Sequence, residues 1–215
     1  MCGRFFLDAP AGEIIEHYNV PPPSLFTARY NIAPTTPVLA RTEEAMTLFR
    51  WGLVPSWSKD ISMGNRMFNA RAETVTQKPS FKQAYRRRRC LIPANGFYEW
   101  ARSDGRKQPY CCGRKGRIFS MAGIWELWQD ADGNELQSCA LLTTEASGEL
   151  ARIHHRMPVF INPQDYDGWL DCRSEKTDIA DQLVNNTVPE YQIYPVSQSV
   201  NNSRNEGPDL ILPLS

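Results

Sequence analysis

The stretch Met1-Cys2-Gly3-Arg4-Phe5-Phe6-Leu7 opens the chain. We predict a short strand over Cys2–Leu7, which holds the N-terminus inside the fold and prevents it from fraying. Because Cys2 is small, we expect Met1 to be removed after synthesis, which leaves an α-amine and a thiol on neighbouring carbons. An α-amine with a pKa of about 7.7–8.0 and a thiol with a pKa of about 8.5 are both partly nucleophilic near neutral pH. An aldehyde can form a Schiff base with that amine, and the thiol then closes a thiazolidine. The alternative is that Cys2 packs as a small hydrophobic residue.

The size and composition of the chain predict one domain, residues 1–215. The chain has 215 residues, of which 41% are hydrophobic and 22% are charged, as is typical of soluble globular proteins. No apolar run approaches the roughly 20 residues that span a membrane, and the N-terminus lacks a signal-peptide pattern. We therefore expect no membrane association and a cytoplasmic protein, associated with DNA or the nucleoid if its source is bacterial.

Six cysteines fit that compartment. None forms a CxxC motif and none pairs with a histidine at metal-ligand spacing, so the sequence predicts no metal site and no cofactor. The chain also lacks G-x-G-x-x-G, Walker A and G-x-S-x-G motifs, which argues against nucleotide binding and an α/β-hydrolase. We expect five of the cysteines to be ordinary buried or half-buried thiols: Cys90, Cys111, Cys112, Cys139 and Cys172.

The charge is balanced overall but is divided unevenly along the chain. Residues 82–117 contain eleven basic and two acidic residues, and residues 118–215 contain fifteen acidic and five basic residues. A basic face on a neutral protein suits an anionic polymer such as a nucleic acid. Two mutually compensating solvated faces are the alternative, and charge alone does not decide between them.

The hydrophobic pattern predicts an α+β domain, rich in strands, with helices at its periphery. Helices are predicted at Asp8–Tyr18 (with Asp8 as a possible N-cap), Ser80–Arg87, Gly148–Arg152, Pro163–Leu170 and Lys176–Val184. Strands are predicted at Val38–Ala40, Met46–Val54, Cys90–Ile92, Gly96–Ala101, Gln108–Cys112, Ile118–Trp125, Ser138–Thr143, Pro158–Ile161 and Tyr191–Val196, with hairpin turns at Ser103–Gly105 and Asp130–Asn134.

Few side chains are candidates for proton transfer. His17 lies on the first predicted helix and is expected at the surface, whereas His154 and His155 lie between a helix and a strand, where catalytic groups are often presented. Both could equally solvate a turn. Glu99 lies between Tyr98 and Trp100 in an apolar strand, and burial there would raise its pKa toward the range of a general acid or base. If its side chain points outward, it has no such role.

Three further residues are candidates for contacts with a nucleic acid. Asn69 and Arg71 share one face if their segment is extended, so that Arg71 can hold a phosphate and Asn69 can orient an amine or a sugar oxygen. Trp57 lies on a polar loop and can stack on an unpaired base, although an isolated tryptophan more often packs against the protein.

Taken together, the motifs of this chain resemble those of the SRAP family (SOS response-associated peptidase). The resemblance covers nearly the whole chain, and the motifs occur in the family's order. They are Met1-Cys2-Gly3-Arg4-Phe5, Tyr30-Asn31-Ile32-Ala33-Pro34, Trp51-Gly52-Leu53-Val54-Pro55-Ser56-Trp57, Asn69-Ala70-Arg71-Ala72-Glu73-Thr74, Gly96-Phe97-Tyr98-Glu99-Trp100, Ile153-His154-His155-Arg156-Met157-Pro158 and Ser203-Arg204-Asn205-Glu206-Gly207.

The resemblance implies a covalent sensor of abasic sites in single-stranded DNA. By this resemblance, the mature Cys2 forms a thiazolidine with the ring-opened sugar, with possible lyase activity on the strand. Glu99 moves protons on the sugar hydroxyls, His154 shuttles protons during Schiff-base chemistry, and Asn69 positions the amine or sugar. His155 stands where the family does not require histidine. The residues that match DNA-binding positions of the family are Arg4, Trp57, Arg71, Thr143 and Arg156.

The resemblance also implies the SRAP-type fold, with a barrel-like core and a basic groove. We expect a monomer whose partner is single-stranded DNA with abasic sites. The loop Ser58–Met67 departs from the family pattern, and the run Arg86–Arg89 lies outside the motifs and is interpreted as a solvated face. Two other functions stay open. One is an N-terminal-cysteine peptidase, which includes self-removal of Met1, and the other is a non-covalent module that binds single-stranded DNA.

Overall fold

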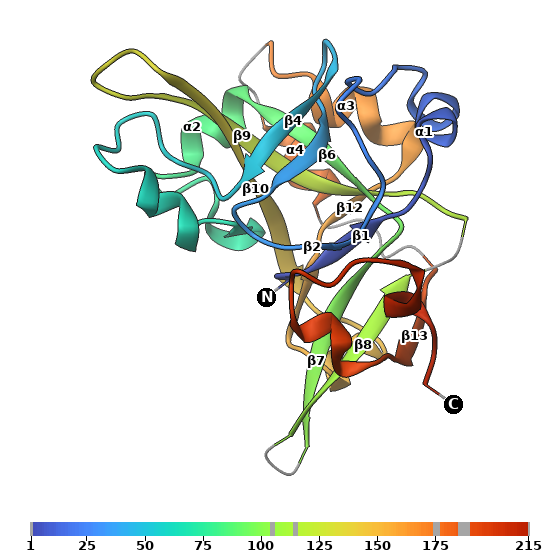
Figure 1. Ribbon diagram of the computed structural model, residues 1–215. Helices are drawn as coiled ribbons and strands as arrows, with labels where there is room; N and C mark the ends of the chain where they lie inside the picture. Colours follow the sequence, from blue (N-terminus) through green and yellow to red (C-terminus); the bar gives the residue numbers. More distant parts are fainter. Residues whose placement is uncertain (1, 104–105, 114–115, 174–176, 185–189, 215) are drawn as a thin grey trace.

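Five strands close into a barrel in the computed structural model of the chain (Figure 1). Around the ring, β10 (Glu135–Glu145) pairs with β4 (Met46–Trp51), β4 with β3 (Pro37–Arg41), β3 with β6 (Arg89–Ala94) and β6 with β9 (Phe119–Gln129); β9 then pairs with β10. The predicted barrel-like α+β core is therefore confirmed. The structure describes every residue except 1, 104–105, 114–115, 174–176, 185–189 and 215.

The β9–β10 hairpin closes the ring because its turn is locally encoded. The Asp130 carboxylate accepts hydrogen bonds from the backbone amides of Asp132 and Asn134, and Gly133 takes a positive φ of 86° that favours glycine. The predicted turn at Asp130–Asn134 is thus confirmed. From this turn the two strands pair in register from Glu135↔Gln129 to Leu141↔Gly123.

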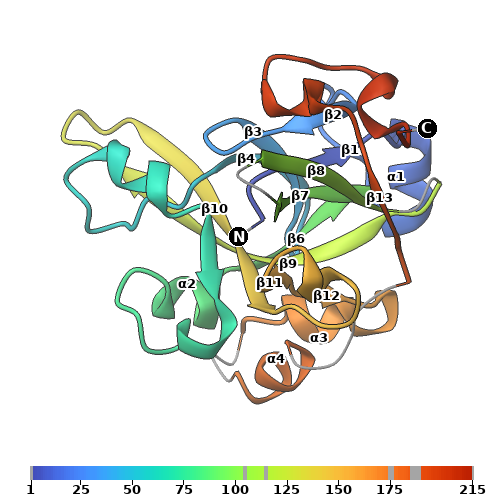
Figure 2. The same cartoon turned by 90° about the horizontal axis from the view of Figure 1, so that it is seen from below.

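A second, five-stranded sheet lies against one end of the barrel, in the order β13-β8-β7-β1-β2 (Figures 1 and 2). Its strands are β13 (Gln192–Pro195), β8 (Arg106–Gly113), β7 (Gly96–Ser103), β1 (Phe5–Leu7) and β2 (Arg29–Ile32). Strand β1 begins at Phe5, later than predicted, but the backbone contact with β7 continues because the amide of Tyr98 donates to the Arg4 carbonyl at 2.9 Å. The turn predicted at Ser103–Gly105 includes residues 104–105, which lie outside the described residues.

Three short strands extend the barrel sheet. Strand β5 (Asn69–Arg71) runs parallel to β10, β11 (Arg156–Pro158) runs antiparallel to it, and β12 (Phe160–Ile161) pairs with β9. In β10, Thr143 is the residue that faces Arg71 on one side and Pro158 on the other. This single strand therefore brings the Asn69–Thr74 and Ile153–Pro158 motifs together.

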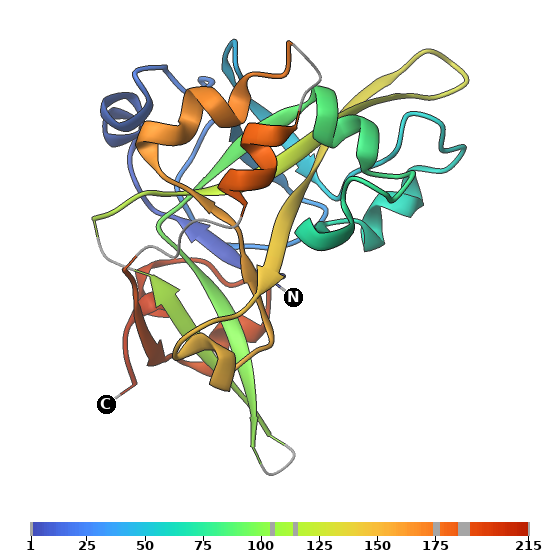
Figure 3. The same cartoon turned by 180° about the vertical axis from the view of Figure 1, so that it is seen from behind.

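Short helices cover the outside, as the pattern predicted. The α-helices are α1 (Ala11–Tyr18), α2 (Lys82–Arg87), α3 (Tyr166–Leu170) and α4 (Asp178–Leu183), and the 3-10 helices are Ile61–Arg66, Ala72–Thr74, Leu150–Arg152, Pro163–Asp165, Gln198–Asn201 and Pro208–Ile211. Figure 3 shows the orange α3 and α4 side by side, in front of the barrel in this view. Within the described residues, no helix is long and apolar enough to span a membrane.

The prediction that Asp8 caps the first helix is wrong. Helix α1 begins at Ala11, with Pro10 at its N-cap position, and the backbone amide of Asp8 instead donates to Asn95 Oδ1 at 3.0 Å. Asn95 is buried and also accepts from the amide of Ala9, so it fixes the exit of β1 before the helix starts.

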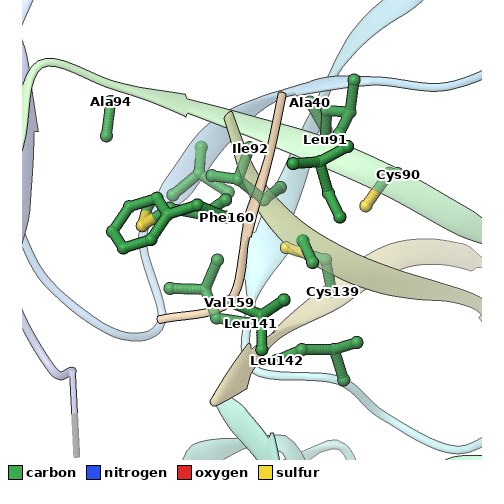
Figure 4. Packing of buried hydrophobic residues seen from close by; sticks show 14 of the residues in the cluster. Ala40, Cys90, Leu91, Ile92, Ala94, Cys139, Leu141, Leu142, Val159 and Phe160 are labelled. Carbon is green, nitrogen blue, oxygen red and sulfur yellow. The ribbon is translucent and has the colours of Figure 1, made fainter. Parts of the chain in front are cut away.

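The core fills the barrel with branched aliphatic side chains, phenylalanines and thiols (Figure 4). Cys90 and Cys139 lie among Leu91, Ile92 and Leu141 there. All six cysteines are free thiols. As predicted, Cys172 is half-buried and Cys90, Cys111, Cys112 and Cys139 are buried; Cys2 is buried as well. Burial raises the pKa of the Cys139 thiol, so this cysteine is an inert packing group.

The interpretation of Arg86–Arg89 as a solvated face is wrong at its C-terminal end. Arg89 is 2% exposed, and its guanidinium donates to the backbone carbonyls of Tyr85, Trp169 and Asp171. Arg88 pairs with Glu126 at 2.8 Å.

The expectation that His17 lies at the surface holds only in part, because its ring is half-buried and contacts the Tyr166 hydroxyl at 2.8 Å.

Candidate active site

Cys2 lies beside β7, next to the strand residue Glu99. The register Phe5↔Phe97 and the bond from the Tyr98 amide to the Arg4 carbonyl place the start of the chain alongside Tyr98–Trp100. Cys2 is fully buried, and its Sγ lies 3.9 Å from the Arg4 carbonyl oxygen. Burial, and then the nearby Glu99 carboxylate, raise the pKa of the Cys2 thiol well above its ordinary value.

Asn69 joins a second part of the chain to Cys2. Its Nδ2 donates to the Cys2 carbonyl oxygen at 2.7 Å, from the first position of β5. Its Oδ1 is buried and has no hydrogen-bond partner within the part of the chain that the structure describes. Since buried polar atoms are rarely left unpaired, this oxygen is suited to accept a hydrogen bond from a bound group.

Glu99 and His154 form a pair of titratable groups. Glu99 is 3% exposed, and burial raises the pKa of its carboxyl to about 7. His154 follows the 3-10 helix Leu150–Arg152, and its Nδ1 lies 3.9 Å from Glu99 Oε1. Desolvation lowers the pKa of His154 from its ordinary value. The carboxyl is therefore poised between its two protonation states near neutral pH and the imidazole is neutral, which suits acid–base chemistry.

A cavity of about 620 Å³ opens over this pair. The structure distinguishes the two adjacent histidines, because His154 Nδ1 lies 3.0 Å from the backbone nitrogen of Arg156 while the ring of His155 packs on that of His154. Both histidines line the cavity, and the ion-pair contact with Glu99 is made by His154. The lining residues are Glu99, Trp100, Lys107, Ala151, Arg152, Ile153, His154 and His155.

The three arginines expected to bind phosphate differ in their surroundings. Arg4 is half-buried, and its Nη1 donates to Asn31 Oδ1 and to the Val200 carbonyl, each at 2.7 Å. Arg156 is 9% exposed and is already ion-paired. Arg71 is exposed at the end of β5. Of these guanidiniums, that of Arg71 is the most accessible to a DNA phosphate.

Trp57 and Thr143 differ in how far their side chains are exposed to solvent. Trp57 is 57% exposed on the loop after β4, a position from which its ring can stack on a base. Thr143 is fully buried in β10, and its hydroxyl lies 3.4 Å from the Ala70 carbonyl. The DNA-binding roles of both residues stay predictions.

Another cavity, of about 850 Å³, lies away from these residues. It is bordered by α1, the start of β9 and α3, and no predicted site residue lines it. We place the candidate active site at the smaller cavity, because Glu99 and His154 meet there. Among the described residues, no group of three or more His, Cys, Asp or Glu side chains could hold a metal ion.

Comparison with known proteins identifies the family. A model of the SRAP family, described as SOS response associated peptidase, matches residues 1–203. This chain belongs to the SRAP family. Its relatives include the Abasic site processing protein YoqW of Bacillus subtilis, which is 36% identical over 98% of this chain and 99% of YoqW. The Abasic site processing protein HMCES of Gallus gallus is 32% identical, over 80% of this chain and 59% of that protein.

Solved structures share the SRAP fold seen here. A Bacteroides thetaiotaomicron protein superposes with a TM-score of 0.89 at 26% identity, covering 100% of both chains. A phage-related protein from Bordetella bronchiseptica has a TM-score of 0.74 at 28% identity, covering 92% of this chain and 95% of the other. The barrel with its added second sheet is therefore the fold of these relatives as well.

Sequence reasoning missed two residues that organise this SRAP site. Glu73 pairs with Arg156 through two bonds of 2.7 and 2.8 Å, and Asn31 accepts from Arg4. Both residues lie inside motifs that were recognised as landmarks. However, their partners are distant in sequence, and only the pairing of β5 and β11 with one strand brings Glu73 to Arg156.

Proposed function

We propose that this protein processes abasic sites in single-stranded DNA by forming a covalent crosslink through Cys2. One observation carries the proposal: Asn69 holds the backbone of Cys2 near Glu99, a poised carboxyl that lines one cavity together with the His154 imidazole. The names of the relatives YoqW and HMCES, abasic site processing proteins, support the same substrate.

The proposed reaction begins with the mature N-terminus. An abasic deoxyribose opens from its cyclic hemiacetal to expose the C1′ aldehyde. The Cys2 α-amine adds to C1′ and water leaves, which gives an imine. The Cys2 sulfur then adds to the same carbon, and its proton passes to the imine nitrogen, closing a thiazolidine. Because the thiol has a raised pKa, it enters the last step together with its proton.

Glu99 and His154 act on the hydroxyl groups of the sugar in these steps. Opening of the sugar ring requires removal of the C1′ hydroxyl proton and protonation of the ring oxygen. A carboxyl with a pKa of about 7 can do either. Loss of water from the first adduct requires a proton on the departing hydroxyl, which we assign to the Glu99 carboxyl, and we assign to the neutral His154 imidazole a hydrogen bond to that hydroxyl. We assign to Asn69 the orientation of Cys2 and of the incoming sugar, through the Nδ2 bond and the unpaired Oδ1.

Single-stranded DNA suits the surface around this site. Arg71 and Trp57 are exposed and offer a cation for a phosphate and a ring for a base. We assign the backbone contacts to Arg4, Arg71 and Arg156, and the groove wall to Trp57 and Thr143. An unpaired strand can bend its abasic nucleotide into a cavity with little unstacking.

The raised thiol pKa argues against the peptidase alternative. A cysteine peptidase attacks with a thiolate, and burial beside Glu99 disfavours that charged form. The crosslinking reaction instead uses the amine as its first nucleophile. Strand cleavage can follow from the imine stage if elimination precedes ring closure, so lyase activity is part of the proposal.

A gel assay of covalent DNA–protein complexes tests the proposal. The protein is incubated with a single-stranded oligonucleotide that carries one abasic site, and with a matched oligonucleotide whose tetrahydrofuran analogue lacks the aldehyde. We expect a heat-stable complex with the first only. Cys2→Ala should abolish it, and Cys2→Ser should give at most a complex that needs a reducing agent to persist. Equal crosslinking by Cys2→Ala would overturn the proposal, and binding without any covalent complex would favour a plain DNA-binding module.

A further inference from the structure

Glu73 forms the most complete ion pair near the candidate site. Its two carboxylate oxygens accept from Nη1 and Nη2 of Arg156, at 2.7 and 2.8 Å. Nη2 also donates to the Thr143 carbonyl at 2.5 Å. The Arg156 bonds lower the pKa of Glu73, so the carboxylate is ionised at neutral pH. A bidentate pair with a third bond fixes the plane and the position of the guanidinium.

The backbone of Arg156 contacts the imidazole ring of His154. The amide of Ala146 donates to the His155 carbonyl at 3.0 Å, so His155 faces β10. Because neighbouring residues of a strand present their polar groups on alternate sides, the amide and carbonyl of Arg156 face away from β10. They lie 3.0 and 3.1 Å from His154 Nδ1.

Nδ1 can bond only one of these two groups at a time. If it carries a proton it donates to the Arg156 carbonyl, and if it does not it accepts from the Arg156 amide. A buried amide N–H is left unpaired far less often than a carbonyl, and Arg156 is 9% exposed. The amide bond is therefore favoured.

We propose that Glu73 is a positioning residue: it anchors Arg156, whose backbone amide holds His154 in the tautomer with its proton on Nε2. The inference rests on the proposed role of His154 and adds the atom through which His154 works. Since the lone pair of Nδ1 is engaged, Glu99, 3.9 Å away, does not exchange a proton with it. The two groups then act separately on the sugar. The Nε2–H of His154 donates a hydrogen bond to the departing hydroxyl and keeps its proton, while the proton that this hydroxyl takes up to leave as water comes from the Glu99 carboxyl.

The tautomer can be measured without DNA. In the full-length protein with ¹⁵N-labelled histidine, nitrogen-detected NMR distinguishes a protonated ring nitrogen from an unprotonated one, and a His154→Asn variant assigns the signals. We expect an unprotonated Nδ1 and a protonated Nε2 in the wild type, and a mixture of both tautomers in Glu73→Ala. Glu145→Ala is the matched control, because Glu145 is an exposed acid opposite Arg156 in the β10–β11 register. It should keep the wild-type pattern.

A rate measurement accompanies the spectra. Glu73→Ala should slow single-turnover crosslinking by about 10- to 100-fold, as expected when a reacting group loses its orientation. Glu73→Gln keeps one acceptor for Arg156, so its crosslinking rate should lie between those of the wild type and Glu73→Ala. It replaces Glu73→Ala if that variant does not fold. A protonated Nδ1 in the wild type overturns the inference, as does a wild-type tautomer pattern in the Glu73 variants. If the tautomers change as expected but no variant crosslinks, including the wild type, then the proposed function fails and the positioning of His154 stands.

Discussion

Asn69 Nδ2 donates to the backbone carbonyl of Cys2 at 2.7 Å, across 67 residues of sequence. The bond ties the start of the chain, which runs along β7, to β5 of the barrel sheet. Cys2 is thereby fixed between two sheets: β7 belongs to the five-stranded sheet, and β5 belongs to the barrel sheet. In the mechanism that we propose, this contact positions Cys2 for its reaction.

Loss of this bond should slow the reaction with an abasic site. We predict that Asn69→Ala lowers the rate of covalent complex formation about tenfold, the equivalent of one hydrogen bond to a group whose position matters. Single-turnover gel assays at saturating DNA measure the rate. Asn134→Ala, at the exposed β9–β10 turn, serves as the control and should react at the wild-type rate. An unchanged rate for Asn69→Ala would remove Asn69 from the site.

The buried carboxyl of Glu99 should make stability depend on pH. Folding raises its pKa from 4.5 to about 7. Between these values the native state binds more protons than the unfolded state, so this group lowers stability as pH rises through that window. Glu99→Gln removes the effect, so we predict that the variant is about 1–3 kcal/mol more stable than the wild type at pH 8 and about equally stable at pH 4. Urea unfolding at the two pH values measures this difference. A Gln variant that is less stable at pH 8 would show that the carboxylate is well solvated.

The same variant should react slowly, since an amide cannot exchange protons. Glu99→Gln should reduce crosslinking while it leaves binding to intact single-stranded DNA unchanged, and His154→Ala should do the same. Fluorescence anisotropy with an unmodified oligonucleotide separates binding from chemistry. Crosslinking by both variants at the full rate contradicts their assigned roles.

Arg71 should contribute to binding through charge alone. We predict that Arg71→Ala weakens binding to every single-stranded sequence, and lowers the slope of log affinity against log salt concentration by about 0.7, the value for one phosphate contact on a single strand. Titrations at several salt concentrations give the slope. Arg86→Ala removes a charge from another exposed arginine, on α2, and should keep the wild-type slope if the arginine run lies outside the groove. A loss confined to particular sequences would indicate a base contact at Arg71.

Arg89 should stabilise the fold without taking part in the reaction. Its guanidinium joins α2 to the C-terminal end of α3, through the carbonyls of Tyr85, Trp169 and Asp171. Replacement by alanine leaves these carbonyls without their donor and opens a cavity, so we predict a loss of about 3 kcal/mol in the free energy of unfolding for Arg89→Ala. Arg86→Ala, measured in the same urea titrations, should change it by less than about 0.5 kcal/mol. Equal effects of the two substitutions would mean that Arg89 is solvated after all.

Local patterns predicted most elements of the fold, because alternation and turn residues act over a few positions. The turn at Asp130–Asn134 and the strands on either side of it are examples. Closure of the barrel depends on β10 pairing with both β9 and β4, and no short stretch of sequence encodes that. Arg89 shows the same limit, since a run of four arginines gives no sign that one of them points into the protein.

The candidate site was predictable where the family motifs carry it. The motifs identified Cys2, Asn69, Glu99 and His154, and the structure brings Asn69 to Cys2 and His154 to Glu99. The bond between Arg156 and Glu73 was missed because the two residues are separated by 83 positions in sequence. They lie close together because β5 and β11 both pair with β10.

Mass spectrometry of the covalent complex tests the central claim most directly. The purified protein is weighed intact before and after incubation with a single-stranded oligonucleotide that carries one abasic site, and the adduct is then digested and mapped. We predict that the protein lacks Met1, and that the complex has the summed mass of protein and DNA less one water. The modification should map to Cys2. An adduct on another residue, or a protein without Met1 that binds the oligonucleotide and never gains its mass, would contradict the thiazolidine mechanism.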